Sequence, residues 1–315
     1  MTTNDSGNQL KALGAWPKLT GPLSLGINIP NSERALFTGT PQWSDLLGMA
    51  EAAAGAGFDV LWFDDHFSFT SDDDLRGAWD AWTHMAAIAA LVPDVYLGPM
   101  VACTAYRNPG VIAKMTEMIQ DISGGRFILG LGAGWHKPEY DQFGLRFEPR
   151  VSQFEEAIHI IHGLLRDGAV DLQGRYYQAN QAVNLPRAAS GPSTPILVGS
   201  SSDRMLKSLV RYADAWNGGG PDDDTIRSKM AKVDAACVAA GRDPKSVIRT
   251  TGVTVAASSE KIVKPGLISG SDDEKITALR HLADLGIEHA YIRLEPTTPD
   301  AISALAPVVA GVYAD

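Results

Sequence analysis

The chain has 315 residues, of which 45% are hydrophobic and 20% are charged, and this composition is ordinary for a globular protein with a substantial core. Its formal net charge of −10 argues against nucleic acid and anionic membranes as partners, because both attract a basic surface. The chain also lacks the ~20 consecutive apolar residues that a membrane-spanning helix needs.

The N-terminal residues and the cysteines bear on location. Residues 1–18 are polar and contain no apolar run of the kind found in a signal peptide. The two cysteines, Cys103 and Cys237, show no paired spacing, which fits a reducing compartment. We therefore expect a cytoplasmic protein in which residues 1–20 are a flexible extension and residues 21–315 form a single domain.

Apolar, β-prone segments alternate with helical patterns along the chain. The segments expected to form strands are residues 23–29, 59–63, 95–102, 127–131, 195–198, 215–218, 247–255 and 290–294. The helical patterns cover residues 43–56, 78–91, 109–122, 151–165, 203–212, 222–240, 272–285 and 299–312. Eight strands alternating with helices predict an α/β fold, a parallel (β/α)8 TIM barrel, rather than an open sheet.

Two segments depart from a plain barrel and are expected to be insertions. Residues 168–194 contain two short strand-like pieces, 169–172 and 175–178, followed by a connector rich in Pro and Ser. Residues 256–271 are polar and could form a lid. Long loops of this kind are usually functional or disordered, and we favour a function for both.

Polar residues follow the second and third predicted strands, where a TIM barrel places its active site. Asp65 and His66 come directly after the second strand. The near-neutral pKa of an ordinary histidine suits proton transfer, although His66 could also serve only to hydrogen-bond a neighbouring strand end. Arg107 precedes a helix that starts at Asn108-Pro109, so it could meet a phosphate or a substrate acid, or simply lie on the surface.

A glycine-rich segment, GLGAGWHKPEY at residues 130–140, follows the fourth strand. No helix starts directly after its glycines, so it is not a dinucleotide-binding fingerprint. Gly132 and Gly134 could let a cofactor approach the bare backbone. Trp135 and Tyr140 offer an aromatic wall and a hydroxyl group.

The fifth strand leads into Gly199, Ser200 and Ser201, just before a predicted helix. Backbone N–H groups, hydroxyls and the helix dipole at such a position can bind a phosphate. Ordinary helix capping by serine is the alternative.

Taken together, these segments resemble the luciferase-like monooxygenase superfamily, which includes bacterial luciferase, flavin-dependent monooxygenases and oxidoreductases that use the deazaflavin coenzyme F420. The resemblance covers most of residues 23–220, and the order and spacing of its pieces match the family. The matching pieces are residues 64–67, 107–109, 130–140, 150–165, 174–177 and 196–217.

The resemblance implies roles for several residues. His66 would lie against the cofactor ring and take part in hydride transfer, and Asp65 would contact the edge of the ring. Met100 and Val101 align with a cis non-prolyl peptide that backs the ring in relatives. In the F420-dependent sugar-phosphate dehydrogenases a general-acid glutamate stands at the position of Trp135, so a sugar-phosphate substrate is not expected here.

We therefore expect an oxidoreductase that transfers a hydride between coenzyme F420 and a small organic substrate. An FMN-dependent monooxygenase that uses oxygen is the first alternative, and a barrel that binds flavin without turnover is the second. A metal-dependent hydrolase is not favoured: His159 and His162 fit an amphipathic helix better than a metal pair, and we expect no metal. A homodimer is possible, since family members commonly pair across barrel helices.

Overall fold

The computed structural model describes residues 16, 23–33, 39–71, 74–191, 194–200, 202–220 and 222–314. Of the expected N-terminal extension, residues 1–20, only Trp16 lies within the described residues. Its side chain is buried, and its ring meets the ring of His289 edge-on, with the ring centroids 5.6 Å apart. His289 is the first residue of a barrel strand, so Trp16 contacts the barrel at the N-terminal end of that strand.

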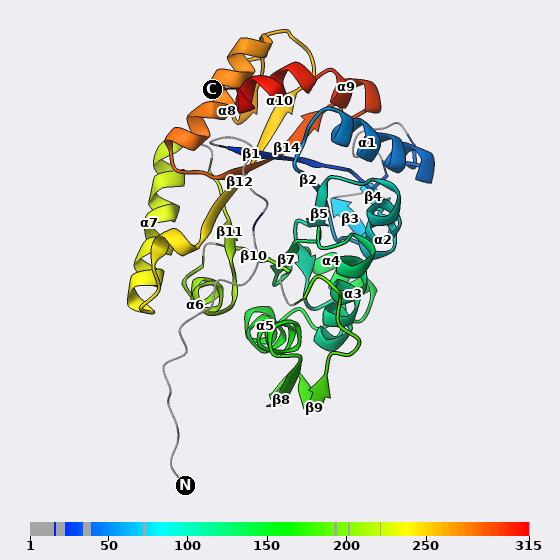
Figure 1. The fold of residues 1–315 in the computed structure, drawn as a ribbon, viewed down its shortest axis with the longest axis vertical. Helices are drawn as coiled ribbons and strands as arrows, with labels where there is room; N and C mark the ends of the chain where they lie inside the picture. Colours follow the sequence, from blue (N-terminus) through cyan, green and yellow to red (C-terminus); the bar gives the residue numbers. More distant parts are fainter. Residues whose placement is uncertain are drawn as a thin grey trace.

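A ring of parallel strands forms the centre of the molecule (Figure 1). The order around the ring is β5-β2-β1-β14-β12-β11-β10-β7-β6, and each printed pairing along it is parallel. The bounds of these strands are β1 Ser24–Asn28, β2 Val60–Phe63, β5 Tyr96–Pro99, β6 Ala102–Cys103, β7 Leu129–Gly132, β10 Ile196–Gly199, β11 Ala215–Asn217, β12 Ile248–Ala256 and β14 His289–Glu295.

The ring closes through β5 and β6, which are two parts of one predicted strand, residues 95–102. β5 pairs with β2, whereas β6 pairs with β7 on the other side. An isolated parallel bridge between Leu97 and Phe127 adds a further link across this junction. The predicted (β/α)8 TIM barrel is therefore confirmed.

Helices surround the ring of strands on the outside (Figure 1). Among the described residues their bounds are α1 Trp43–Gly55, α2 Ala81–Leu91, α3 Pro109–Ile122, α4 Lys137–Gln142, α5 Arg150–Arg166, α6 Asp203–Tyr212, α7 Asp223–Ala239, α8 Asp272–Asp284, α9 Pro299–Ser303 and α10 Ala306–Tyr313, with a short 3-10 helix at Pro244–Ser246. None of these helices is long and apolar enough to cross a membrane.

The barrel helices form because their apolar residues recur on one side. In α6, Leu206 and Leu209 face the core, whereas Lys207 and Arg211 are exposed. Helix capping also contributes. At the N-terminus of α3 the side chain of Asn108 accepts a hydrogen bond from the Gly110 backbone N–H, and Pro109 occupies the first helical position.

A hydrogen-bonded group lies inside the barrel. The indole N–H of Trp62 donates to Nε2 of His289 at 2.9 Å, so the ring proton of His289 is on Nδ1 and points to Ser24 Oγ, 2.7 Å away. All three side chains are buried. Burial lowers the pKa of His289 to about 3, and the imidazole is therefore neutral.

Three local features differ from the sequence predictions. The last predicted helix, residues 299–312, is two helices, α9 and α10, because Pro307 cannot continue the helix that precedes it. The insertion at 168–194 is an antiparallel hairpin of β8 Ala169–Gln173 and β9 Gln178–Val183, so its second strand lies later than the predicted 175–178. A second hairpin, β3 Ser68–Ser71 with β4 Asp74–Gly77, was not predicted.

The polar segment 256–271 is tied to the body of the protein. A short strand, β13 Leu267–Ile268, pairs with β12. Lys261 forms an ion pair with Glu274 at 3.1 Å, and Lys264 forms one with Glu295 at 3.4 Å. Whether the segment moves as a lid stays a prediction.

Candidate active site

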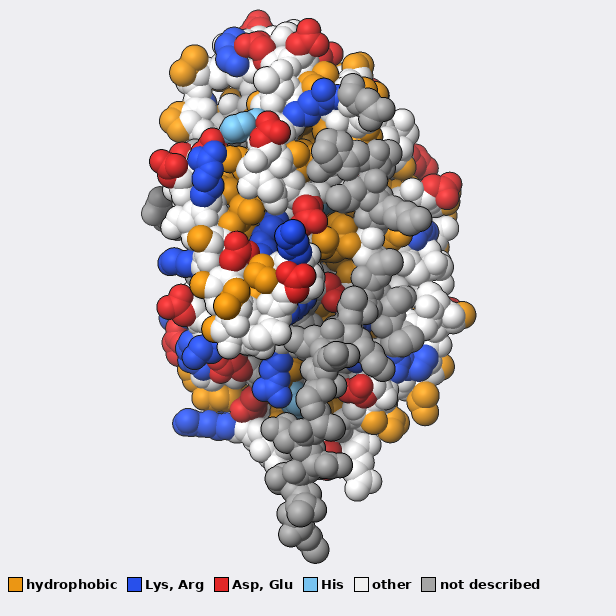
Figure 2. Space-filling model, turned by 60° about the vertical axis from the view of Figure 1, so that its left-hand side comes forward, with side chains coloured by type: hydrophobic (Ala, Val, Ile, Leu, Met, Phe, Trp, Pro, Cys, Tyr) orange, Lys and Arg blue, Asp and Glu red, His pale blue; other side chains and the backbone are white. Residues whose placement is uncertain are grey.

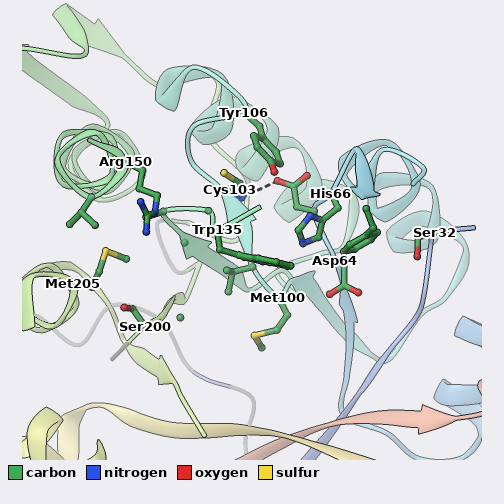
Figure 3. Close-up of a pocket in the computed structure, with 18 of the residues that line it drawn as sticks. Ser32, Asp64, His66, Met100, Cys103, Tyr106, Trp135, Arg150, Ser200 and Met205 are labelled. Carbon is green, nitrogen blue, oxygen red and sulfur yellow. Dashed lines mark hydrogen bonds between the residues drawn. The ribbon is translucent and has the colours of Figure 1, made fainter. Parts of the chain in front are cut away.

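A cavity of about 700 Å³ opens at the C-terminal ends of the barrel strands (Figure 3). Its lining comes from the segments after six strands, as expected for the active-site face of a TIM barrel. The lining includes Ser32, Asp64, Asp65, His66, Phe69, Arg76, Met100, Val101, Cys103, Tyr106, Gly132, Gly134, Trp135, Arg150, Gly199, Ser200, Ser202, Met205 and Arg293.

Trp135 divides this cavity into two ends. In Figure 3 the indole lies across the middle, with Arg150, Ser200 and Met205 on one side and His66, Asp64 and Ser32 on the other. The Trp135 side chain is 65% exposed, so it is an outer wall of the cavity rather than part of the core. An exposed indole beside a cavity can cover a planar ligand.

His66 is oriented by a carboxylate that lies outside the cavity lining. Its Nδ1 is 2.8 Å from Oε2 of Glu139, and the Glu139 side chain is fully buried. Trp135 contacts the same imidazole edge-on, with the ring centroids 5.6 Å apart. With Nδ1 committed to Glu139, Nε2 is the ring atom left for a ligand in the cavity.

Glu139 is held as a carboxylate by several donors. Burial alone would raise its pKa, but hydrogen bonds from His66 and Tyr106 outweigh burial, and the pKa is lowered. The Tyr106 hydroxyl donates at 2.6 Å, and the backbone N–H of Ser68 donates at 3.1 Å. A carboxylate can only accept, so Nδ1 of His66 carries the proton of the shared hydrogen bond.

Asp65 lies against the cavity floor and is paired with Arg107. Burial raises the pKa of Asp65, and the guanidinium group of Arg107, 2.9 Å away, opposes that shift. Asp65 also accepts from the backbone N–H of Cys103 at 3.1 Å.

Arg107 does not line the cavity, contrary to the expectation that it could meet a phosphate or an acid there. Its second nitrogen donates to Asp80 at 2.7 Å, and its guanidinium lies over the rings of Phe67 and Trp82. Two carboxylates and two aromatic rings therefore occupy it. Arg150 does line the cavity, and in Figure 3 it lies on the same side of Trp135 as Ser200.

Met100 and Val101 both line the cavity, and the peptide bond between them is cis. The junction lies between β5 and β6, at the point where the third strand is interrupted. The cis peptide implied by the family resemblance is therefore present in the structure.

The two glycines of the GAGW segment make room for neighbouring side chains. A Cβ at Gly132 would lie 2.6 Å from Val101 Cγ2, and one at Gly134 would lie 1.9 Å from the Tyr140 hydroxyl. Gly134 also has a φ of +77°, which favours glycine. Both positions line the cavity, but the structural reason for glycine here is the close approach of Val101 and Tyr140.

Tyr140 and Cys103 form a buried pair beneath the cavity. The Tyr140 hydroxyl is 3.1 Å from Cys103 Sγ and donates to the Ala133 carbonyl at 2.9 Å. Burial raises the pKa of the Cys103 thiol to about 12, so it stays protonated and is no nucleophile. Tyr140, expected at the cofactor, is fully buried and supports the Gly134 loop instead of lining the cavity.

Gly199, Ser200 and Ser202 line the end of the cavity near the start of α6. The side chain of Ser202, the N-cap residue, makes no capping hydrogen bond, so the first backbone N–H groups of α6 are not covered by it. The buried Trp216 holds the Ser200 carbonyl through its indole N–H at 2.6 Å. Ser201, also expected at the cofactor phosphate, lies outside the described residues.

Several residues of this site were not predicted from the sequence. The sequence pattern assigned no role to Glu139, which lies on the short helix α4 with its carboxylate against His66. Arg293 lies 3.7 Å from Asp64, and Arg76 lies over the Phe69 ring, which contacts His66, so both line the His66 end of the cavity. Arg150 lines the end near Ser200. A single arginine at a strand or helix end carries no sequence signal that separates a cavity residue from a surface residue.

Comparison with known proteins agrees with this architecture. The sequence model that describes luciferase-like monooxygenases matches residues 23–287. Pyrimidine monooxygenase RutA from Methylobacterium radiotolerans is 32% identical over 212 residues, which cover 61% of this chain and 53% of that protein. The chain therefore matches about half the length of this curated relative.

Two further proteins are similar to the chain. The F420-dependent hydroxymycolic acid dehydrogenase from Mycobacterium tuberculosis is 27% identical over 230 residues, covering 72% of this chain and 61% of that protein. The solved structure of an F420-dependent secondary alcohol dehydrogenase in complex with an F420-acetone adduct superposes with a TM-score of 0.78 at 18% identity, covering 92% of this chain and 99% of the other. At that identity the superposition shows a shared fold.

Proposed function

The chain belongs to the luciferase-like monooxygenase family, and we propose that it is an oxidoreductase that transfers a hydride between coenzyme F420 and a small organic substrate. The His66–Glu139 pair beside the open cavity carries this proposal. It presents one ring nitrogen to the cavity and fixes the proton on the other, which suits proton transfer next to a ring that exchanges a hydride.

The chemistry of the cavity fits a deazaflavin or flavin. Its volume of about 700 Å³ is within the usual range for small-molecule sites. Met100, Val101 and Trp135 supply apolar and aromatic walls for a planar ring. A phosphate requires positive charge and hydrogen-bond donors. These would come from Arg150, which is also paired with Glu148, from Ser200, and from the N-terminus of α6, where the Ser202 side chain makes no cap.

When bound, F420 would supply two-electron hydride chemistry. The residues of this chain would hold the ring between Met100-Val101 and Trp135 and exclude water from that space. His66 would accept or donate a proton at Nε2 as charge develops on the substrate oxygen, while Glu139 stabilises the imidazolium form. Asp65, tied to Arg107, would hold the floor of the site in place.

An FMN-dependent monooxygenase is the second candidate. The observation in its favour is the similarity to pyrimidine monooxygenase RutA, which at 32% exceeds the 27% identity to the hydroxymycolic acid dehydrogenase. The two candidates share the ring site and the phosphate end. The two candidates differ in the cofactor, because F420 carries a further chain beyond its phosphate and FMN does not. They also differ in whether the reaction consumes oxygen.

A titration separates the two candidates. The purified protein, freed of cofactor, is titrated with F420 and in parallel with FMN, and cofactor fluorescence gives each Kd. We expect F420 to bind more tightly than FMN. Equal or tighter binding of FMN would replace F420 by FMN in this proposal, and oxygen uptake with reduced FMN would then test the monooxygenase directly.

A further inference from the structure

A second cavity of about 650 Å³ lies on the outside of the barrel, between α5, α6 and the β8–β9 hairpin. Among the residues that the structure describes, none lines both this cavity and the active-site cavity. The hairpin is the insertion at residues 168–194, which a plain barrel does not need, and Figure 1 shows it beside α5. The residues that matter here are Arg175, Lys207 and Arg211, with Glu155 and Glu156 nearby.

The two cavities lie along the same pair of helices. At the barrel mouth, Arg150 at the start of α5 and Met205 in the first turn of α6 line the active-site cavity. Further along, His159 of α5 and Arg211 of α6 line the second cavity. Residues 150 and 159 are nine positions apart, about 13 Å along the helix axis.

Arg204 bridges α5 and α6 at a position between the two cavities. It lies on α6 between Met205 and the N-terminus, and it donates to Ser152 Oγ of α5 at 3.0 Å and to the Glu155 carboxylate. Ser152 and Glu155 line the second cavity. The surface of the helix pair between the two cavities therefore carries polar side chains from both helices.

The second cavity has cations that the protein does not neutralise. Lys207, Arg211 and Arg175 are exposed and form no ion pair with a described residue, whereas both acids of the lining are engaged. Glu155 is paired with Arg204, and Glu156 accepts from the backbone N–H groups of Arg175, Tyr176 and Tyr177.

Aromatic side chains fix two of these cations over the cavity. The Arg211 guanidinium lies 5.2 Å from the Tyr212 ring centroid, and the Arg175 guanidinium lies 5.6 Å from that of Tyr176. Tyr212 is in turn held by His159 at 3.1 Å. Figure 2 shows Lys and Arg side chains interspersed with Asp and Glu side chains on the lower part of the face turned toward the viewer.

We propose that this second cavity binds the oligoglutamate tail of coenzyme F420 as the tail leaves the phosphate end of the active site between α5 and α6. The inference rests on the proposed function. A flexible chain of carboxylates matches a row of free cations, and about four extended residues span the distance along α5. The net charge of −10 opposes such a tail at long range, but within about 10 Å the local cations dominate. FMN carries no such tail, so this cavity would select for F420.

The test compares F420 that carries several glutamate residues with F420 that carries none, each titrated into the full-length protein and followed by cofactor fluorescence. We expect the glutamate-bearing form to bind more tightly, by about twofold to fivefold for each cation that contacts the tail. The difference should shrink as salt is raised, because exposed charges are screened.

Lys207→Gln and Arg211→Gln should each remove part of this difference and leave the affinity for the glutamate-free form unchanged. Lys245→Gln is the matched control, because it removes one exposed cation near the opposite ends of the strands, just before β12. Its affinities should equal those of the wild type.

The possible failures are distinguishable. If both forms of F420 bind the wild type equally well, the tail lies elsewhere and this inference is wrong, while F420 remains the cofactor. If neither form binds and FMN does, the proposed function falls, and the tail site falls with it. A loss of affinity in the Lys245→Gln control as large as in the other variants would show a general charge effect and would also overturn the inference.

Discussion

At the scale of single residues, the pairing of His66 with Glu139 is the feature that most constrains the chemistry. The two residues are 73 positions apart, on the segment after β2 and on the short helix α4. No local sequence rule connects them. Their contact fixes which nitrogen of His66 faces the cavity, so the roles of the two side chains can be separated by substitution.

Replacing His66 by Ala should lower kcat by about 100-fold or more and change the cofactor Kd by only a few fold. The reason is that a proton-transferring group acts mainly in the transition state. Turnover is measured with a substrate that the wild type accepts, and the Kd comes from a fluorescence titration. If cofactor binding collapses while the saturated variant keeps its turnover, His66 is a structural residue.

Replacing Glu139 by Gln should lower kcat by about tenfold or more and leave cofactor affinity nearly unchanged. The amide cannot stabilise a cationic imidazole, and it can bind His66 in the wrong tautomer. Tyr106→Phe is the matched control, because it removes one hydrogen bond from the same carboxylate but keeps its charge. Equal losses of kcat in the two variants would mean that Glu139 acts through packing alone.

At the scale of helices and strands, the sequence predicted most of the fold because alternating apolar segments directly reflect burial. The predicted bounds of α3 and α6 coincide with the observed ones. The prediction was wrong where one residue changes the backbone: Pro307 divides the last helix into α9 and α10. The third predicted strand is divided into β5 and β6, and hydrophobic periodicity marks neither this division nor the cis isomer of the Met100-Val101 peptide between them.

The site was predictable only in part, for a related reason. His66, Asp65, Met100, Val101, Gly132, Gly134, Trp135, Gly199 and Ser200 follow strand ends, and all of them line the cavity. Arg107 also follows a strand end, but Asp65 and Asp80 attract it away from the cavity. Such competition between partners is decided by tertiary contacts that no strand or helix pattern records.

The N-terminus of α6 gives a prediction at this scale. If it holds the cofactor phosphate, Ser200→Asp places a negative charge against a phosphate and should weaken cofactor binding by roughly 2–4 kcal/mol. The helix itself should be unharmed, because an acidic residue near a helix N-terminus is favourable. Cofactor affinity is measured by titration, and the fold is checked by circular dichroism.

Ser271→Asp is the matched control for that substitution. Ser271 is the N-cap residue of α8, on a helix that contributes no residue to the active-site cavity. The control should bind the cofactor like the wild type. Unchanged affinity in Ser200→Asp as well would place the phosphate away from α6, and Arg150 would then be the next position to substitute.

At the scale of the whole molecule, the pH dependence of folding stability follows from titratable groups that are buried without charge in the barrel wall and its interior. His289 is fully buried, and burial lowers its pKa to about 3. His84 of α2 is also buried, and burial lowers its pKa to about 4, with Asp80 opposing the shift. Neither ring nitrogen of His84 has a hydrogen-bond partner among the described residues.

These two histidines should make the fold sensitive to mild acid. Between pH 7 and pH 5 the unfolded chain takes up protons on both, because an unfolded histidine has a pKa of about 6.5, whereas the folded chain does not. Stability therefore falls as the pH falls through this window, by about 2 kcal/mol for each histidine. Urea unfolding of the cofactor-free protein at pH 7 and pH 5 measures the loss. His84→Leu should reduce the loss by about 2 kcal/mol, because leucine fills the site without a titratable group. A His84→Leu variant with the full acid sensitivity of the wild type would show that His84 is protonated in the folded protein and that its surroundings accept the charge.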